Sequence, residues 1–265
     1  MRIFFADLDG TLLNDQKEIT PRTKQAVDAF VAAGNRFVIS TGRPLQSAVA
    51  TQERLGLKYP GSYVSAYNGA VIYDSTSEKT LYETGIALDL IEPILEIADS
   101  CQVHIQAYQD RYIVSRTYNR HLQYYRDHIP MPVILADDML TELPSPPWKL
   151  LAIDLDGRER LNIFHEKLSE QLGQFVRPVF SGPYYVDIFP VTAGKGKSLI
   201  QLCQLLNVPV ENSLAAGDEE NDIPMLKAAG CGICMCNGKD EVKRAADVVT
   251  SEDNNHDGLL PFLKI

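Results

Sequence analysis

The chain has few of the features that mark disulfide-rich, membrane-spanning or nucleic-acid-binding proteins. It has five cysteines in 265 residues, an odd number without the spacing of a disulfide framework. It lacks a run of about 18 apolar residues, so no membrane partner is expected, and its start lacks a signal-peptide layout. The 35 acidic residues outnumber 25 basic ones, for a net charge of −10, so no nucleic-acid partner is expected. We expect a cytoplasmic globular protein whose oligomeric state the sequence leaves open.

Three of the cysteines, Cys231, Cys234 and Cys236, lie close together in a short apolar segment. Alternation along a strand would send Cys231 to the face opposite the other two. No histidine follows at zinc-finger spacing, so a four-ligand zinc site is not expected. The segment is interpreted as a buried strand in which cysteine acts as a small hydrophobe.

Apolar, strand-length segments alternate with helix-like segments at both ends of the chain. The pattern predicts strands at Arg2–Ala6, Arg36–Ser40 and Tyr63–Ala66 with helices between them, and it resumes near Gly194. Such alternation is typical of a parallel sheet with helices on both faces. Between them, the helices are segregated from neighbouring strands, which indicates an α+β lobe. The sequence therefore predicts an α/β fold: a doubly wound core of residues 1–82 and 187–265, interrupted by an inserted α+β cap at 83–186.

The first expected strand runs directly into Asp7-Leu8-Asp9-Gly10-Thr11. Ligands of open α/β sheets bind outside the carboxyl ends of the strands. A carboxylate there can ligate a metal ion or attack phosphorus, and a second carboxylate two residues later can exchange protons with the reacting oxygen. Asp and Gly are also ordinary turn residues, but the pentad favours a functional site.

Two further strand ends carry polar groups. Thr41, Gly42 and Arg43 follow the second strand, where a hydroxyl and free backbone N–H groups at a helix start can bind an anion. Another strand ends in Gly217-Asp218-Glu219-Glu220-Asn221-Asp222, whose clustered acids repel one another unless a cation is present. Oxygen ligands of this kind suit Mg²⁺. Lys195, just before a predicted helix, supplies a cation for a phosphate.

These motifs together resemble the haloacid dehalogenase (HAD) superfamily, and specifically its Cof-type (subfamily IIB) sugar-phosphatase-like hydrolases. Asp7–Thr11 matches the family's DxDGT, Thr41 falls at its second motif, Lys195 at the lysine of its third, and Gly217–Asp222 matches GDxxND. Tyr67-Asn68-Gly69-Ala70 and Asp257-Gly258 also resemble patterns of that subfamily. The resemblance covers essentially the whole core and implies a cap inserted after the third core strand.

The resemblance implies a Mg²⁺-dependent phosphatase that hydrolyses small phosphorylated metabolites, such as sugar phosphates or phosphorylated cofactors. By analogy, Asp7 attacks phosphorus and forms an aspartyl-phosphate. Asp9 protonates the leaving oxygen and then deprotonates the attacking water. Thr41 and Lys195 hold the oxygens of the transferring group.

The resemblance also implies a metal site and a phosphate site. Mg²⁺ is expected on a carboxylate oxygen of Asp7, the backbone carbonyl of Asp9 and the side chain of Asp218, with Asp222 orienting a metal-bound water or Lys195. Substrate and phosphate contacts are expected from residues at the same strand ends: Gly10, Thr11, Thr41, Gly42, Arg43, Asn68, Lys195 and Asn221.

Parts of the sequence also fit other functions. A phosphomutase of the same superfamily, which returns the phosphoryl group to another hydroxyl, stays open. A non-catalytic phosphate-binding module is disfavoured by Asp9, and a dehalogenase by metal-binding acids that its chemistry would not need. Asp154-Leu155-Asp156-Gly157 repeats part of the first motif but lacks a partner acid loop. Gly194-Lys195-Gly196-Lys197-Ser198 lacks the first glycine of a P-loop.

Overall fold

The computed structural model describes residues 1–109 and 112–264. The chain divides into two compact units, one formed by Met1–Tyr82 with Gly194–Ile265 and the other by Glu83–Ala193. The sequence predicts the second boundary after Val186, but the structure has it after Ala193. The reason is that β11 (Tyr185–Pro190) pairs with strands of the second unit on both sides.

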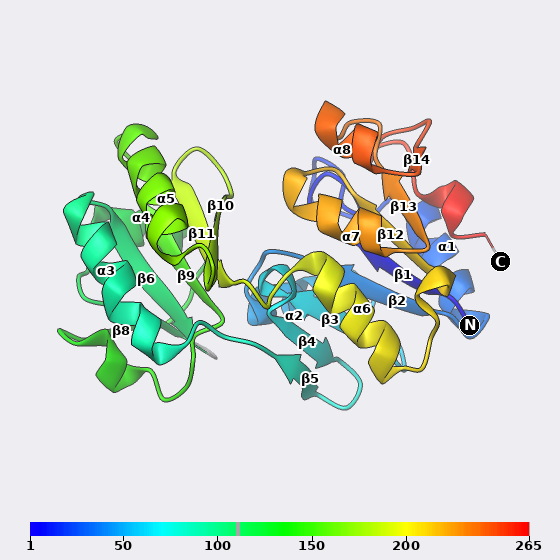
Figure 1. Cartoon of the computed structure of the whole chain (residues 1–265). Coiled ribbons are helices and arrows are strands. Elements are labelled where there is room, and N and C mark those ends of the chain that lie inside the picture. Colours follow the sequence, from blue (N-terminus) through cyan, green and yellow to red (C-terminus); the bar gives the residue numbers. More distant parts are fainter. Residues whose placement is uncertain (110–111, 265) are drawn as a thin grey trace. The chain divides into compact units, whose positions relative to one another are not determined.

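The first unit is built on an eight-stranded sheet in the order β14-β13-β12-β1-β2-β3-β4-β5 (Figure 1). Neighbouring strands from β14 to β3 are parallel, and β4 runs antiparallel to β3. The parallel-sheet core predicted from the alternation is confirmed, whereas the β4–β5 extension was not predicted. The strands are β1 (Ile3–Ala6), β2 (Arg36–Ser40), β3 (Tyr63–Ala66), β4 (Val71–Asp74), β5 (Lys79–Glu83), β12 (Ser213–Gly217), β13 (Cys231–Cys234) and β14 (Val248–Val249).

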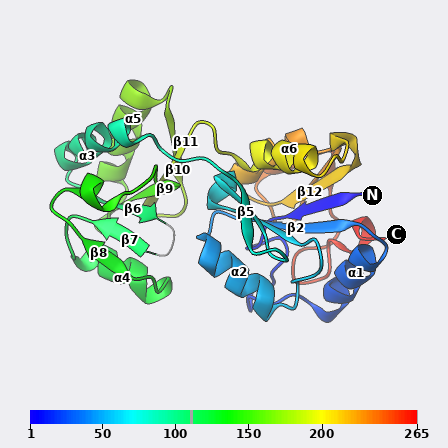
Figure 2. The same cartoon turned by 90° about the horizontal axis from the view of Figure 1, so that it is seen from below.

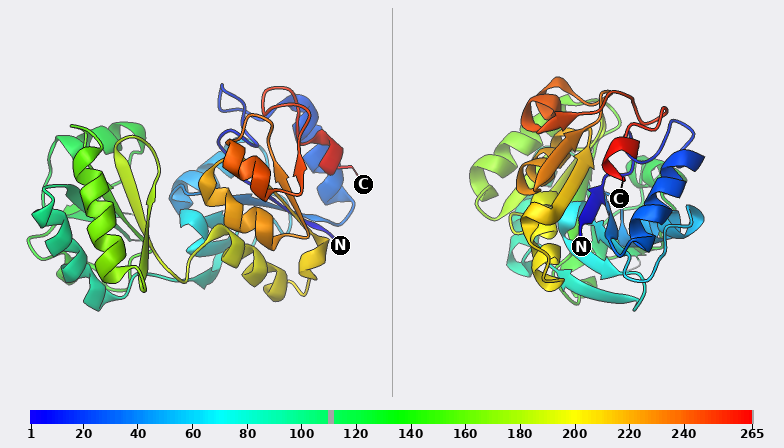
Figure 3. Two further views of the ribbon diagram at one scale, coloured as in Figure 1. Left: turned by 45° about the horizontal axis from the view of Figure 1, so that its top comes forward. Right: turned by 90° about the vertical axis from the view of Figure 1, so that its right-hand side faces the viewer.

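Helices cover both faces of this sheet, because its central strands are apolar on both sides. All four residues of β1 are buried. The helices on one face are α1 (Pro21–Ala32) and α2 (Leu45–Arg54), and those on the other are α6 (Lys195–Leu205), α7 (Ile223–Ala228) and α8 (Asp240–Ala245) (Figures 2 and 3). The start of α1 has a hydroxyl cap, since the Thr20 side chain accepts a hydrogen bond from the Thr23 N–H.

The second unit has a six-stranded sheet in the order β10-β11-β9-β6-β7-β8, antiparallel except for the β7–β8 pair. The strands besides β11 are β6 (His104–Gln109), β7 (Tyr112–Ser115), β8 (Val133–Leu135), β9 (Lys149–Ile153) and β10 (Val176–Phe180). Figure 2 shows α3 (Ile91–Ser100) and α5 (Glu159–Leu172) on one face of the sheet and α4 (Arg120–His128) on the other.

Each unit has its own apolar core. The apolar cluster of the second unit joins α3 and α5 to the sheet through residues such as Ile94, Phe164 and Ile188. The first unit packs Phe5 and Val38 of the sheet against Leu199 and Met225 of its helices. In the described part of the chain, no helix combines the length and the apolar character needed to cross a bilayer.

Candidate active site

The predicted functional residues of the first unit come together because four neighbouring strands end at the same edge of the sheet. Asp218 follows β12, Asp7 follows β1, Thr41 follows β2, and Asn68 lies in the turn after β3. The parallel register Ala216↔Ala6↔Ile39 sets these strand ends level with one another. This is the edge at which open α/β sheets bind their ligands.

Lys195, the first residue of α6, carries an ammonium group that lies between two carboxylates. Its Nζ donates to Asp7 Oδ1 at 2.6 Å and to Asp222 Oδ1 at 2.5 Å, and the side chain is 1% exposed. Burial alone would lower the pKa of Lys195, but Asp222 and Asp7 outweigh it and raise the pKa above its ordinary value. The lysine is therefore a fixed positive charge beside Asp7.

Asp222 has both carboxylate oxygens engaged within the protein. Oδ1 accepts from Lys195, and Oδ2 accepts from the backbone N–H groups of Asp218 and Glu219 at 3.0 and 3.1 Å. Gly217 lets this side chain approach, since a Cβ there would lie 2.4 Å from the Asp222 Cβ. Of the two roles predicted for Asp222, orientation of a metal-bound water or of Lys195, these contacts favour the orientation of Lys195, together with that of the acidic loop.

Asp218 is held from the opposite side by the loop after β1. The Thr11 hydroxyl donates to Asp218 Oδ1 at 2.7 Å, so in this structure Thr11, predicted to bind phosphate, orients the aspartate. Gly10 has a φ of +76°, and a Cβ there would lie 2.3 Å from Asp218 Oδ2. Glycine at this position thus serves both the left-handed backbone conformation and the close approach of the carboxylate.

Oxygen atoms of Asp7, Asp218 and Asp222 lie within 4.8 Å of one another, close enough to hold a metal ion. The three carboxylates face one ammonium, which leaves two negative charges uncompensated. Burial, with repulsion from Asp222 and Asp218, raises the pKa of Asp7 to about 8 against the effect of Lys195. Burial likewise raises the pKa of Asp218 to about 6. A divalent cation that prefers oxygen ligands fits this deficit in charge and donor type.

Asp7 and Asp218 each keep one oxygen for such a cation. Lys195 contacts Asp7 Oδ1, and Thr11 contacts Asp218 Oδ1. Within residues 1–109 and 112–264, no hydrogen-bond donor contacts the second carboxylate oxygen of either residue. These two side chains are therefore the carboxylates best placed to bind a metal ion.

Asp9 points to two cations instead of to the carboxylate cluster. Arg43 Nε donates to Asp9 Oδ2 at 3.0 Å, and Arg43 Nη2 donates to both Asp9 oxygens at 2.7 Å. Lys17 Nζ donates to Asp9 Oδ1 at 2.7 Å. Burial raises the pKa of Asp9, but Lys17 and Arg43 outweigh it and hold the pKa below its ordinary value. Arg43, predicted to contact substrate, is thus a partner of the predicted acid–base residue.

Thr41, Gly42, Asn68 and Asn221 form a second group at the same edge. The Thr41 hydroxyl accepts from the Arg43 N–H at 3.2 Å, and its carbonyl accepts from the Asn68 N–H at 3.0 Å. The Asn68 side chain accepts from Asn221 Nδ2 at 3.0 Å and lies against Gly42, with φ of +53° at its own Cα. These contacts tie the loops after β2, β3 and β12 to one another.

Two polar residues of the site, Lys17 and Asn237, are not among those predicted from the sequence. Lys17 lies in a turn after the first motif, and nothing in the sequence separates it from a solvated surface lysine. Asn237 donates from Nδ2 to the Gly10 carbonyl at 2.8 Å. It follows β13 by three residues, so the rule that directs attention to strand ends could have found it.

Motifs that were set aside at the sequence level have structural partners. Asp154 is buried and accepts from Arg160 Nε and Nη2, each at 2.7 Å, in the turn after β9. Ser198 is hydrogen-bonded to Ser65 at 2.8 Å on the first turns of α6. Among the described residues, the carboxylate cluster is the group found suitable for a metal ion, and no cysteine belongs to it.

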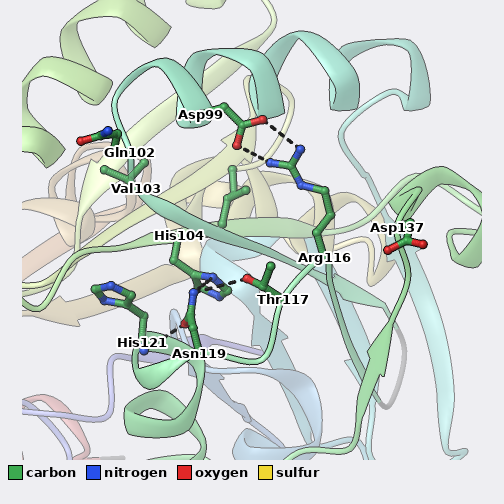
Figure 4. A pocket seen from close by; sticks show the side chains of 10 residues that line it. Asp99, Gln102, Val103, His104, Arg116, Thr117, Asn119, His121 and Asp137 are labelled. Carbon is green, nitrogen blue, oxygen red and sulfur yellow. Dashed lines mark hydrogen bonds and ion pairs between the residues drawn. The ribbon is translucent and has the colours of Figure 1, made fainter.

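The second unit contains a polar cavity of about 480 Å³ at the start of β6 and the end of β7 (Figure 4). A bidentate Arg116–Asp99 ion pair lies on one side, and His104, Asn119 and Thr117 form a hydrogen-bonded group on the other. None of the predicted functional residues lines this cavity.

Comparison with known proteins places the whole chain in one family. The family model of haloacid dehalogenase-like hydrolases matches residues 4–263. The 5-amino-6-(5-phospho-D-ribitylamino)uracil phosphatase YitU of Bacillus subtilis is 29% identical over 97% of this chain and 94% of its own. The pyridoxal phosphate phosphatase YbhA of Escherichia coli is 28% identical over 99% of this chain and 97% of its own. Among solved structures, TM0651 from Thermotoga maritima has 32% sequence identity to this chain and a TM-score of 0.85. The match covers 99% of this chain and 96% of TM0651.

The fold and the site define a phosphoric monoester hydrolase acting on phosphorylated small molecules. The chain belongs to the haloacid dehalogenase-like hydrolases, and the resemblance that its four motifs indicate is confirmed.

Proposed function

We propose that the protein is a Mg²⁺-dependent phosphatase that transfers the phosphoryl group of its substrate to Asp7 and then to water. The observation that carries the proposal is the arrangement of Asp7. Its carboxylate follows the central strand β1, the buried Lys195 fixes one of its oxygens, and the side chain belongs to the unbalanced carboxylate cluster. A nucleophile needs this combination of fixed orientation and an unoccupied oxygen.

The protein's own residues divide the reaction among them. One carboxylate oxygen of Asp7 attacks phosphorus in line while the other is left for the metal ion, the P–O ester bond breaks, and Asp9 gives a proton to the leaving oxygen. In the second half, Asp9 takes a proton from the water that hydrolyses the aspartyl-phosphate. Lys195 and the Thr41 hydroxyl hold the phosphoryl oxygens during both steps, which is the main need in phosphoryl transfer.

Asp7, Asp218 and the backbone carbonyl of Asp9 would hold the Mg²⁺ ion. Bound Mg²⁺ would offset the negative charge shared by the carboxylates and the phosphoryl group. The role of Asp222 is to keep Lys195 and the Asp218 backbone in place through both of its oxygens.

The substrate class follows from the relatives. Their names specify a phosphorylated ribitylamino-uracil and pyridoxal phosphate, each a small molecule with one phosphate ester. We extend this class, small sugar- or cofactor-like phosphate monoesters, to the present chain. We further propose that the second unit, Glu83–Ala193, sets the preference among them, because every residue of the carboxylate cluster lies in the first unit.

Turnover of p-nitrophenyl phosphate under controlled metal supply tests the proposal. EDTA should abolish turnover, Mg²⁺ should restore it, and Ca²⁺ should restore it poorly. Ca²⁺ takes more ligands at longer distances than Mg²⁺, so it can draw both Asp7 oxygens into coordination and block the attack. Full activity in EDTA would refute the metal-dependent part of the proposal.

A further inference from the structure

Asp9 has more positive charge around it than one carboxylate needs. Arg43 alone engages both of its oxygens through Nε and Nη2. Lys17 also donates to Oδ1, the oxygen that already accepts a hydrogen bond from Arg43 Nη2. The three side chains together carry one excess positive charge, at the edge of a site that is otherwise acidic.

The two cations are held in different ways. The Arg43 side chain is 26% exposed and its Nη1 also contacts Thr51 of α2 at 3.3 Å. The Lys17 side chain is 61% exposed, whereas its backbone is fixed: its N–H donates to the Asn14 carbonyl, and its own carbonyl accepts from Arg54 Nη2, both at 2.9 Å. Lys17 is thus a long, solvated side chain on an anchored turn, and its ion pair is of the exposed kind that contributes little to stability.

Lys17 also stands in the way of the chemistry proposed for Asp9. The Asp9 oxygen that exchanges a proton with the leaving group must face that group, and one of its two oxygens carries the lysine contact. If the substrate carries an anion that Lys17 can contact, Lys17 can leave Asp9 at little cost in free energy, because the substrate anion replaces the Asp9 carboxylate as its partner. A substrate with a neutral leaving group gives no such replacement.

We propose that Lys17 is a specificity-determining residue that leaves Asp9 to bind an anionic group, a carboxylate or a second phosphate, on the leaving-group side of the substrate. The inference rests on the proposed function, because contact with Asp9 is what places Lys17 on that side. It narrows the substrate class to phosphate esters that carry a second anion on the leaving group.

Two matched substrate pairs test this role. 3-Phosphoglycerate differs from glycerol 3-phosphate by a carboxylate, and fructose 1,6-bisphosphate differs from fructose 6-phosphate by a phosphate. The wild-type protein should prefer the more anionic member of at least one pair. In Lys17→Met, the ratio of kcat/KM values within that pair should fall at least about tenfold, which corresponds to one lost charge-assisted contact. The pair that responds identifies the anion.

Lys24→Met is the control variant. Lys24 lies on α1 and forms an ion pair with Asp28 at 2.6 Å, so the change removes an equal charge from the same unit, and the ratios should stay at their wild-type values. An equal loss on both members of each pair in Lys17→Met would mean that Lys17 serves the common phosphoryl group or merely supports Asp9, and would overturn the proposal. Unchanged ratios, or a wild-type preference for the less anionic member of both pairs, would also overturn it.

The outcome also separates this inference from the proposed function. p-Nitrophenyl phosphate turnover by the wild-type protein, and its loss in Asp7→Asn, report on the function itself. If both are observed while the ratios do not respond, the role of Lys17 alone is wrong. If the wild-type protein turns over none of these esters, the proposed function fails and the inference fails with it.

Discussion

The surroundings of Asp7 disfavour its charged carboxylate unless a cation is bound beside it. Lys195 neutralises one charge, but Asp222 and Asp218 add two more in a buried place, and the pKa of Asp7 rises to about 8. Removing one of these charges in the absence of metal should therefore relieve repulsion.

The variant Asp7→Asn separates chemistry from folding. Turnover should fall at least about a thousandfold, because the amide is nearly isosteric but a poor nucleophile. The melting temperature in EDTA should equal or exceed that of the wild-type protein, since one of three like charges is lost while Lys195 keeps Asp222. Retention of more than a few per cent of the wild-type kcat would remove Asp7 from its proposed role.

Gly10 and Gly34 form a matched pair for testing the metal site. Both have left-handed backbones, with φ of +76° and +89°, so each Gly→Ala change should cost about 1–2 kcal/mol of unfolding free energy. An added Cβ at Gly34 meets nothing within 4 Å, whereas at Gly10 it meets Asp218 Oδ2. Only Gly10→Ala should raise the Mg²⁺ concentration for half-maximal activity, at least about tenfold. Similar metal titrations for the two variants would contradict the placement of Asp218.

The predicted site residues that the structure brings together are those whose positions follow from the sheet. Asp7, Asp218 and Lys195 could be placed together because strand ends and a helix start converge by topology. The partners of Asp9 could not be placed in the same way. Lys17 reaches it from a turn, and the orientation of a long exposed side chain has no counterpart in a sequence pattern.

At the level of elements, the central parallel strands were predictable because they are continuous apolar runs. The β4–β5 hairpin was missed because β5, Lys79–Glu83, is largely exposed and shows no apolar alternation. Helix α4 was missed because its residues are mostly polar, and only Leu122 and Tyr125 are buried. The boundary after Val186 was wrong because an apolar strand gives no sign of which sheet it joins.

The residue that caps α4 contacts a buried histidine, His104, at the start of β6. Asn119 caps the helix by accepting from the His121 and Leu122 N–H groups, and its Nδ2 contacts His104 Nδ1 at 3.0 Å (Figure 4). Burial, with His121 and Arg116 nearby, lowers the pKa of His104 to about 4 against a contact with Gln106. Between pH 6.5, the ordinary pKa of histidine, and pH 4, the unfolded chain therefore binds a proton at His104 that the folded state does not bind.

Lowering the pH from 6.5 to 4 should consequently destabilise the second unit by roughly 3 kcal/mol through His104. His104→Gln should remove that part of the pH dependence. Trp148, the one tryptophan of the chain, lies in this unit, so urea unfolding followed by its fluorescence reports on the unit directly. Parallel pH curves for the two proteins would show that His104 does not contribute.

At the scale of the whole molecule, the two units have separate cores and are joined at Tyr82–Glu83 and Ala193–Gly194. This division allows the second unit to be exchanged. A chimera carrying the corresponding unit of YbhA should raise kcat/KM for pyridoxal phosphate, relative to p-nitrophenyl phosphate, at least about tenfold. Asp7→Asn in the chimera should abolish both activities. An unchanged preference in a folded, active chimera would place specificity in the first unit.

The most direct test of the central claim is to look for the phosphoryl group on Asp7. In Asp9→Asn, hydrolysis of the intermediate should be slow, while p-nitrophenolate leaves without needing a proton. Acid quenching during turnover of p-nitrophenyl phosphate, followed by peptide mass spectrometry, should find one phosphoryl group on the peptide containing Asp7. The group should be absent in Asp7→Asn. Phosphate on another residue, or continued turnover with no covalent phosphate, would contradict the account.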